Sequence, residues 1–531
     1  MPRTAGDSDE DFKLAKHWLN DCISSHEHCK KPKPLETPLP TRVLDLGPGP
    51  ESEEPYLLET GGLHGNYIAL SHCWGGQVPL TTTSDTLSER KRCISLAALP
   101  RTFRDAVMIS RQLGIRYLWI DSLCILQDSK TDWEKESAVM GDVYGQSYLT
   151  IAARGAANAE TGCFIPRKEE PPTCCLEYHS TDDSIRGKMY IRDPAFELER
   201  IDESPLDERG WVFQERILSP RILYYGSQQL YWECNNATLR QDGKYRDVII
   251  DDVRLDDGSK QSWDPAGVRT PKYFRDTDQQ KLEMNGISAE RLECLRHWYC
   301  ITEQYARRKL TFASDRLPAI AGIAKQFQHR TGYTYVAGLW KEDLMAGLLW
   351  YRRTAEDAPT SLKLPSWSWA RFGGEVRFWS AFNTIFGCLN VLSTDCELLN
   401  LSYETTDNLG NYGEISNARI QIKGRVAPVV LKPTPPARSH FGKTMLYTKN
   451  GAFAGKPYFD IGDRFSSQQV GSEFFCLLVH QEKGGSRGLL LERVEGHTTE
   501  YRRIGYVTVH LPFLDGSIPF ADIHPQVLTL I

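Results

Sequence analysis

The sequence predicts an α/β protein built on a parallel sheet, with a helical extension and a β-rich C-terminal subdomain. Apolar segments at 67–71 and 116–121 flank an amphipathic segment at 102–113. A strand, a helix and a strand in this order form a βαβ unit, whose two strands are parallel. After residue 418, short apolar segments alternate with turns, which is typical of a β-rich fold.

The chain begins with an expected helix and a lead-in rich in Pro and Gly, which together span 1–63. Apolar residues between 10 and 30 recur at helical spacing. The Pro- and Gly-rich stretch at 31–55 is interrupted by a short expected strand at 42–46. We expect the α/β domain itself to span 64–240.

The second half of the α/β domain repeats the alternation of helix and strand. A helix is expected at 131–144, with Ser129 or Thr131 as its N-cap, followed by a strand at 148–153. The segment 209–234 alternates short apolar runs with polar residues, which indicates strands and a short helix. These elements extend the predicted parallel sheet.

The rest of the chain divides into three expected parts. Residues 241–282 are charged and polar, and we expect a long excursion or a linker there. Residues 283–417 form a companion region, helical in its first part and rich in Trp. Residues 418–531 form the β-rich C-terminal subdomain.

The composition is that of an ordinary globular protein and argues against several function classes. The chain has 531 residues, with 63 Lys and Arg against 69 Asp and Glu. This net charge of −6 lacks the basic excess of a nucleic-acid-binding domain. No apolar run is long enough to span a membrane, and the acidic, polar N-terminus does not resemble a signal peptide. We therefore expect a cytoplasmic protein whose 14 Cys are free thiols.

The first candidate site follows the strand at 67–71. Ser71, His72, Cys73 and Trp74 come directly after this strand, and open α/β sheets bind ligands at the carboxyl ends of their strands. A thiol beside an imidazole could act as a nucleophile pair. We favour a tight turn in which Cys73 and Trp74 pack, and we expect the loop to contact a ligand.

A second candidate site follows the strand at 116–121. Asp121, Ser122 and Cys124 begin a polar loop that runs to Asp128. Asp and Ser are also common in turns, so a purely structural role is an equal alternative. Their position at a strand end is the argument for ligand binding.

The third candidate is a carboxylate on the helix at 131–144. Glu136 shares a helix face with Trp133 and Met140. Burial on this apolar face would raise the pKa of Glu136, as an acid, a base or a transition-state-stabilising group needs. The alternative is a structural ion pair with an Arg, and Arg209 and Arg216 are the candidates.

Two further clusters of polar residues have structural alternatives. Five charged residues surround aromatic residues at 207–216, which favours an ion-pair network, although Arg209 also suits a phosphate. Cys22, His26, His28 and Cys29 lie close together near the first helix. A second ligand pair with matching spacing is missing, so we expect no metal site and keep zinc as the alternative.

Six blocks of this sequence resemble the fungal heterokaryon-incompatibility (HET) domain in the order in which that family has them. The resemblance covers roughly 64–216, and three later segments resemble the usual C-terminal companion of HET proteins. The HET-like blocks are 67–75, 99–106, 117–125, 132–136, 140–144 and 209–216, and the companion-like segments are 314–317, 338–340 and 365–370.

The resemblance implies a role in fungal non-self recognition, in which HET domains trigger programmed cell death. The HET family is also distantly similar to TIR domains, which have a flavodoxin-like α/β fold and in many cases cleave NAD with a helix glutamate. Ser129, Trp133 and Glu136 resemble the serine, tryptophan and glutamate of that TIR helix, with a Trp-to-Glu spacing one residue shorter than usual.

Three hypotheses follow from the resemblance, and the first is the one we expect. The protein is an NAD glycohydrolase-like cell-death effector with Glu136 as catalytic residue, NAD as substrate and no cofactor. Alternatively, it is a recognition module without catalysis that acts through a protein trigger or self-association. A third alternative is a HET-like enzyme of small-molecule metabolism. The residues expected to bind a nucleotide or other small ligand are Ser71, His72, Cys73, Trp74, Asp121, Ser122, Cys124, Trp133 and Arg209.

Overall fold

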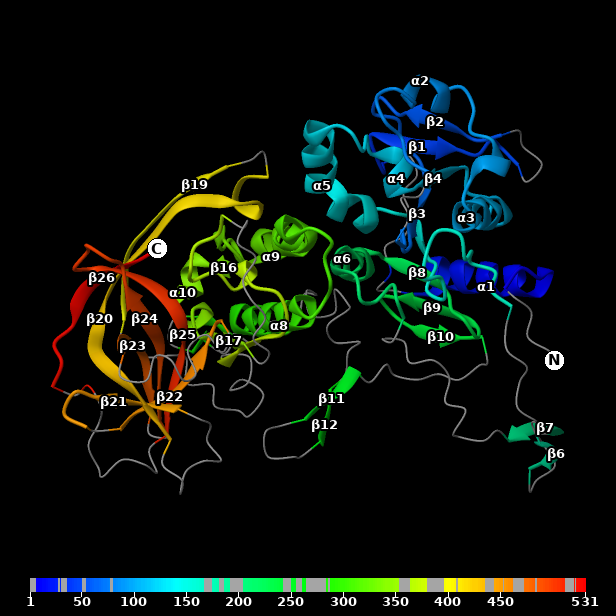
Figure 1. Ribbon diagram of the computed structural model, residues 1–531. Helices are drawn as coiled ribbons and strands as arrows, with labels where there is room; N and C mark the ends of the chain where they lie inside the picture. The colour runs from blue at the N-terminus through cyan, green and yellow to red at the C-terminus, as the bar shows by residue number, and fades with distance from the viewer. Residues whose placement is uncertain are drawn as a thin grey trace. The chain divides into compact units, whose positions relative to one another are not determined.

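The chain folds into two compact units, residues 1–272 and 273–531, in a computed structural model (Figure 1). Each unit is described by itself. The residues that the structure describes are 6–26, 29, 36–49, 54–76, 80–166, 174–180, 186–191, 204–241, 250–254, 260–263, 283–284, 287–352, 363–379, 396–406, 409–434, 444–451, 453–461, 472–482, 485–510, 520 and 522–531.

The first unit is built on an eight-stranded sheet with the strand order β10-β9-β8-β5-β3-β4-β1-β2. The outer strands on both sides are antiparallel to their neighbours, so the sheet is mixed. The strands are β1 (Arg42–Asp45), β2 (Tyr56–Glu59), β3 (Tyr67–Ser71), β4 (Tyr117–Trp119), β5 (Leu149–Ala152), β8 (Arg221–Tyr225), β9 (Leu230–Cys234) and β10 (Thr238–Arg240).

The four central strands of this sheet are parallel, which confirms the predicted βαβ unit. β3 pairs in parallel with β4 on one side and with β5 on the other, and β5 continues to β8. The chain leaves β3 toward β4 but leaves β5 in the opposite direction, toward β8. The sheet therefore has its topological switch point between β3 and β5.

Helices cover both faces of the parallel strands. Because crossover connections are right-handed, α3 between β3 and β4 lies on the face opposite α5, which connects β4 to β5. Figure 1 shows α3 and α5 on opposite sides of these strands, and α6 packs on α5. The helices are α1 (Asp9–Ser25), α2 (Leu87–Arg90), α3 (Arg101–Gln112), α4 (Asp121–Cys124), α5 (Lys130–Gly145) and α6 (Gly210–Leu218).

Local sequence signals explain where these helices begin. The predicted cap of α5 is confirmed, because the Ser129 hydroxyl accepts the backbone N–H of Asp132 at 3.2 Å. The expected loop from Asp121 to Asp128 begins instead with the single helical turn α4. Every residue of β3 is buried, as expected of a strand with helices on both faces.

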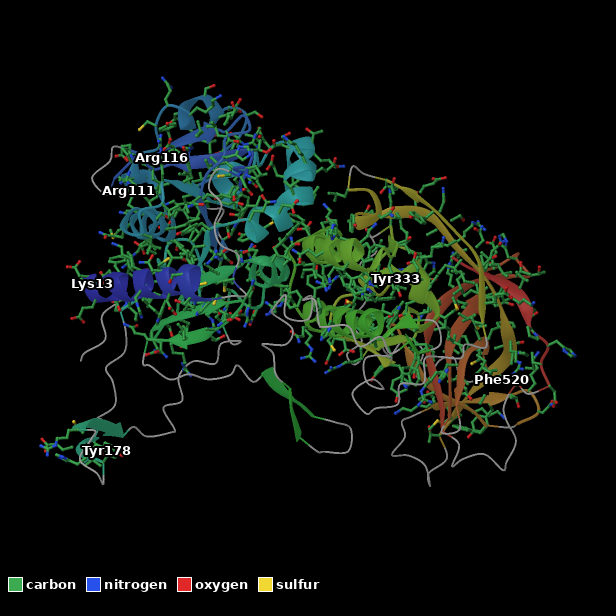
Figure 2. The ribbon with its side chains drawn as sticks, turned by 180° about the vertical axis from the view of Figure 1, so that it is seen from behind. Lys13, Arg111, Arg116, Tyr178, Tyr333 and Phe520 are labelled. Atoms are coloured by element: carbon green, nitrogen blue, oxygen red, sulfur yellow. The ribbon has the colours of Figure 1, made fainter. Side chains whose placement is uncertain are left out.

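Two Arg side chains fix β1 near the edge of the sheet, where it lies next to β4. Arg116 donates to both carboxylate oxygens of Asp45 in β1, each at 2.7 Å. Arg111, near the end of α3, donates to the carbonyl of Leu46. Figure 2 shows Arg111 and Arg116 close together at this edge. Such bidentate contacts are stronger than single neutral hydrogen bonds.

The second unit combines a helical, Trp-rich part with a large antiparallel sheet. Phe327 stacks on Trp340 with ring centroids 4.3 Å apart, and Trp298 packs edge-on against Trp340. Figure 2 shows Tyr333 in the helical part and Phe520 beside the strands. The elements of the helical part are α8 (Ala289–Ala306), α9 (Ala321–Thr331), α10 (Leu344–Gly347), β15 (Tyr335–Val336), β16 (Leu339–Trp340), β17 (Trp350–Arg352) and β18 (Val376–Phe378).

The sheet of the second unit closes on itself through one long strand. β20 pairs with both β21 and β23, so β20, β21, β22, β25, β24 and β23 form a ring. β19, the first strand of this sheet, begins at Glu397, whereas the β-rich subdomain was expected to begin at residue 418. The strands are β19 (Glu397–Thr405), β20 (Ile415–Pro433), β21 (Thr444–Thr448), β22 (Phe453–Phe459), β23 (Glu473–Glu482), β24 (Gly485–Arg493), β25 (Glu500–His510) and β26 (Gln526–Leu530).

Several short hairpins lie between the larger elements of the chain. The hairpin at 250–263 falls in the segment 241–282, which was expected to be an excursion or a linker. The hairpins are β6 (Cys174–His179) with β7 (Arg186–Ile191), β11 (Ile250–Arg254) with β12 (Lys260–Trp263), and β13 (Glu283–Met284) with β14 (Ile287–Ser288).

Candidate functional site

Polar side chains from neighbouring strands meet at the carboxyl edge of the parallel sheet. His72 follows β3 and Asp121 follows β4, and their Nε2 and Oδ1 atoms lie 3.8 Å apart. Trp74 donates its indole N–H to the other oxygen of Asp121 at 2.9 Å. Two segments that are far apart in the sequence are thus brought together. We refer to the side chains of Ser71, His72, Trp74, Asp121, Arg209 and Glu215 as the strand-end cluster.

Helix α6 brings a cation and a carboxyl group to the same place. Arg209, at the N-cap of α6, donates through Nη1 to the carbonyl of His72. Glu215 is buried and lies within hydrogen-bonding reach of the side chains of Ser71 and Tyr144. Sequence reasoning named Arg209 but did not name Glu215 as a site residue.

The carboxyl group of Glu215 changes its charge near neutral pH. Burial raises the pKa of Glu215 to about 7, although the positive charge of Arg209 opposes this rise. The hydroxyl proton of Tyr144 goes to the carbonyl of Leu70 at 3.1 Å. A protonated Glu215 can therefore donate to the Tyr144 oxygen, which fits a carboxyl group held neutral by its surroundings.

His72 is a neutral imidazole with one unused acceptor. Burial lowers the pKa of His72 to about 4, although Asp121 opposes this shift. One ring nitrogen bonds to the carbonyl of Leu70, and Nε2 has no hydrogen-bond partner among the described residues. The carboxylate of Asp121 lies 3.8 Å from Nε2, and it is itself an acceptor. A hydrogen-bond donor from a ligand would satisfy both groups.

Cys73 has the properties of a packing residue and not of a nucleophile. Its side chain lies in an apolar cluster with Ala152, Leu206 and Val212. Burial raises the pKa of the Cys73 thiol to about 11, so the reactive thiolate is scarce at neutral pH. The geometry agrees with the tight turn that we favoured over a Cys/His pair.

The loop after Cys73 makes a close contact that only glycine allows. Gly75 has a φ of +79°, and a Cβ atom there would lie 2.4 Å from the Cβ of Asn158. At the next residue, Gly76, a Cβ atom would meet none of the described residues within 4 Å.

We expect Gly75→Ala to destabilise the first unit by about 1–3 kcal/mol, because it adds both a clash and backbone strain. Gly76→Ala is the matched control and should change stability by less than about 0.5 kcal/mol. The stability of both variants is measured by urea unfolding, with hydrogen exchange of the β3 amides as the readout. Equal effects of the two substitutions would contradict the contact between this loop and Asn158.

The other residues of the second candidate loop are Ser122, Cys124 and Asp128, and each has a different environment. The Ser122 hydroxyl is buried and has no hydrogen-bond partner within the described part of the chain. Cys124 is an inert core thiol, because burial raises its pKa to about 12 and its sulfur accepts the N–H of Ile120. Asp128 accepts the backbone N–H of Ser84, which is a structural contact between two loops.

Glu136 is buried, but it contacts a different set of residues. Its Oε1 atom lies 3.9 Å from Nη2 of Arg42, which also pairs with Asp132. Burial raises the pKa of Glu136, as expected, while a hydrogen bond from Thr41 and the charge of Arg42 oppose the rise. The structural alternative named the wrong cations, because the cations near Glu136 are Arg42 of β1 and the neighbouring Lys135, whose Nζ also lies 3.9 Å from Oε1.

The three other side chains of this region are also placed by the structure. Arg209 bonds to His72, and Arg216 lies 3.6 Å from Glu233. Trp133 packs edge-on against Trp211 of α6, with ring centroids 6.4 Å apart. Both Arg side chains were proposed for Glu136 because spacing along one chain cannot show that β1 lies beside α5.

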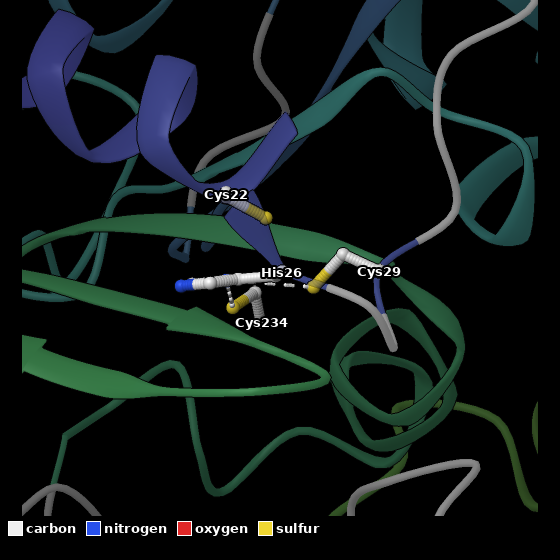
Figure 3. Close-up of side chains that lie close together, drawn as sticks. All are labelled: Cys22, His26, Cys29 and Cys234. Carbon is white, nitrogen blue, oxygen red and sulfur yellow. Dashed lines mark hydrogen bonds between the residues drawn. The ribbon is translucent and has the colours of Figure 1, made fainter. Parts of the chain in front are cut away.

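Among the described residues, one group of side chains could hold a metal ion. Cys22, His26 and Cys29 meet Cys234, the last residue of β9, which sequence reasoning missed (Figure 3). His26 does not lie on the helix as expected, because α1 ends at Ser25 and His26 is extended. His28 lies outside the described residues.

The fold and the strand-end cluster define an α/β domain that carries polar groups at the carboxyl ends of β3 and β4, beside its switch point, and comparison with known proteins identifies its family. Residues 67–215 match the family model described as heterokaryon incompatibility protein (HET). No curated protein and no solved structure matches the chain. Residues 67–215 of the first unit are therefore those of a HET domain, and they include β3, β4, β5, most of α6 and the whole strand-end cluster.

The described helices also bear on the expected absence of a membrane span. Among them, none has the combination of length and apolar character that crossing a bilayer requires.

Proposed function

We propose that this HET protein acts in fungal non-self recognition and triggers cell death by hydrolysing NAD. The observation that carries the proposal is the strand-end cluster, in which His72, Trp74, Asp121 and Arg209 meet at the carboxyl edge of a parallel sheet. Open α/β sheets bind nucleotides at this edge, at the switch point of the strand order. The HET family itself is associated with heterokaryon incompatibility.

The cluster offers the groups that a dinucleotide needs. Arg209 is partly exposed and can meet a phosphate, which Arg recognises through paired N–H groups. Asp121 can accept hydrogen bonds from ribose hydroxyls, as acidic residues do in other nucleotide sites. The unused acceptor of His72 and the unpaired hydroxyl of Ser122 gain partners from the same ligand. Both predicted strand-end segments therefore take part in the proposal.

The proposed reaction breaks the bond between nicotinamide and the ribose. The bonding electron pair goes to the pyridinium nitrogen, so neutral nicotinamide leaves and an oxocarbenium cation forms at the sugar. Water adds to this cation and releases a proton, which gives ADP-ribose. A carboxylate beside the sugar stabilises the developing positive charge, and no metal is required.

Two buried carboxyl groups are candidates for this role. Glu136 is the candidate from the resemblance to TIR domains, and Glu215 lies in the strand-end cluster itself. Burial raises the pKa of each. A carboxyl group of this kind becomes ionised when a cationic ligand arrives, and in low dielectric it then stabilises positive charge strongly.

Expression of the chain in fungal cells tests the proposal. We expect wild type to deplete NAD and stop growth, and we expect Asp121→Asn and Arg209→Ala to do neither. Asp128→Asn is the matched control, since this carboxylate lies in the same loop but binds a backbone N–H. Growth arrest without NAD loss would contradict NAD hydrolysis and favour a recognition module without catalysis. If the wild-type chain causes neither NAD loss nor growth arrest, the result favours the small-molecule alternative.

A further inference from the structure

Four side chains with metal-ligand atoms meet between the N-terminal helix and the sheet of the first unit. Cys22 lies in α1, His26 and Cys29 follow this helix, and Cys234 ends β9. Their ligand atoms all lie within 4.8 Å of one another (Figure 3). His26 and Cys234 are 208 positions apart, so the fold, and not the local sequence, creates this group.

We propose that Cys22, His26, Cys29 and Cys234 bind one zinc ion, which fastens the N-terminal helix to the sheet of the HET domain. Three thiolates and one imidazole form a known ligand set of structural zinc sites. Four protein ligands leave no open position, so the ion has a structural and not a catalytic role.

The distances fit a tetrahedral ion. Nδ1 of His26 lies 3.3 Å from the sulfur of Cys234 and 3.7 Å from that of Cys29. A tetrahedron with Zn–S of about 2.3 Å and Zn–N of about 2.0 Å has edges of about 3.5–3.8 Å. Small shifts of these side chains are enough to place an ion at the centre. Cys22, Cys29 and Cys234 are buried and are free thiols, so no disulfide joins them.

A carboxylate outside the ligand set orients the histidine for this role. Nε2 of His26, the ring nitrogen that faces away from the sulfur atoms, lies 3.4 Å from the carboxylate of Asp21. Histidine ligands commonly donate their second N–H to a carboxylate, which leaves the other nitrogen free to bind the metal. Asp21 therefore fixes the tautomer in which Nδ1 is the ligand atom.

The surroundings also balance the charge of the proposed centre. Zinc with three thiolates carries one net negative charge, and the buried Arg221 places a positive charge near Cys22 and Cys29. The backbone N–H groups of Asn236 and Ala237 point to the sulfur of Cys234. Both features stabilise thiolates in a buried place.

The consequence is that the folded HET unit extends beyond the matched residues on both sides. All four proposed ligands lie outside 67–215. A second contact supports the same attachment, since Gln241 donates to Asp11 of α1 and accepts the N–H of Leu230. The N-terminal helix and the strand β9 then form one unit through the ion.

Metal analysis of the purified full chain tests this inference. We expect one zinc ion per chain after zinc reconstitution and dialysis, and tetrahedral thiolate–cobalt absorption when cobalt replaces zinc. Cys234→Ser and His26→Ala should lose the metal, and His26→Cys should keep it because thiolate is an equivalent ligand. Asp21→Asn should weaken zinc binding about tenfold. Cys163→Ser, which changes a buried Cys outside the cluster, is the matched control and should keep full occupancy.

The outcomes separate a metal site from packed thiols. Loss of zinc in Cys234→Ser alongside its retention in His26→Cys and Cys163→Ser supports the site even where stability falls. A reconstituted wild-type chain with no zinc and no cobalt spectrum would overturn it. A disulfide between two of these Cys in the zinc-treated chain, detected by mass spectrometry, would also overturn it. These readouts do not depend on NAD hydrolysis.

Discussion

Arg42→Ala is expected to destabilise the first unit by about 3–5 kcal/mol, because it removes a buried cation that pairs with the half-buried Asp132 and faces the buried Glu136. Nη2 of Arg42 pairs with Asp132 and lies 3.9 Å from Glu136, and Nε donates to the carbonyl of Cys124 at 2.7 Å. All three contacts come from one guanidinium at the start of β1. Its removal therefore affects β1, α4 and α5 together.

Hydrogen exchange of α5 amides measures this effect in the part of the chain concerned. Lys91→Ala is the control, because Lys91 and its partner Glu59 are both exposed and such pairs contribute about 0–1 kcal/mol. Arg42→Lys should recover only part of the loss, since Lys cannot make the contacts of a planar guanidinium. A loss in Arg42→Ala no larger than in Lys91→Ala would contradict the buried role of Arg42.

His72 and Glu215 should give the first unit two opposite pH dependences of stability. His72 has a pKa of about 4 when folded against 6.5 ordinarily, so the unfolded chain binds the extra proton and stability rises from about pH 4 to 6.5. Glu215 has a pKa of about 7 against 4.5, so the folded chain holds the extra proton and stability falls from about pH 4.5 to 7. Each effect corresponds to about 3 kcal/mol.

These opposite slopes largely cancel in wild type, and single variants should reveal them. Relative to wild type, Glu215→Gln should become more stable as pH rises from 5 to 8, because the variant avoids burying a charge. Relative to wild type, His72→Gln should become less stable over the same rise in pH. The reason is that wild type gains stability as its imidazole no longer has to lose a proton on folding. Urea unfolding at each pH, with hydrogen exchange of the β3 amides as the readout, gives both curves of stability against pH. Parallel curves for wild type and both variants would contradict these shifted pKa values.

Hydrophobic patterning was enough to predict the central elements of the first unit. The strands β3, β4 and β5 and the helices α3 and α5 follow from apolar periodicity, a helix cap and the order of elements. The outer strands could not be ordered in this way, because antiparallel pairing at a sheet edge depends on contacts between distant segments. The likeness to TIR and flavodoxin-like folds stays a prediction.

The rule that ligands bind at strand ends located part of the candidate site. His72, Trp74 and Asp121 come together because they follow adjacent parallel strands. Glu215 was missed because only the packing of α6 on the sheet shows that it faces Ser71. A signal was present, since a charged residue that is helically spaced with apolar neighbours often occupies a buried face.

The other missed residues depend on contacts across the fold. Arg42 begins a fully buried strand, and an Arg in such a strand predicts a buried anion nearby without identifying it. Cys234 had no metal-ligand motif around it in the sequence. Its partners Cys22 and Cys29 become neighbours only when α1 packs against β9.

The most direct test of the account is nicotinamide release from NAD by the purified full chain, followed by chromatography. We predict release by wild type, and a loss of about 100-fold or more in Glu136→Gln if this carboxylate stabilises the cation. Glu215→Gln tests the second carboxyl group. Glu134→Gln is the control, because Glu134 lies on the same helix as Glu136 but pairs with Lys130. Full release by both Glu136→Gln and Glu215→Gln would contradict the carboxylate roles, and no release by folded wild type would contradict NAD hydrolysis.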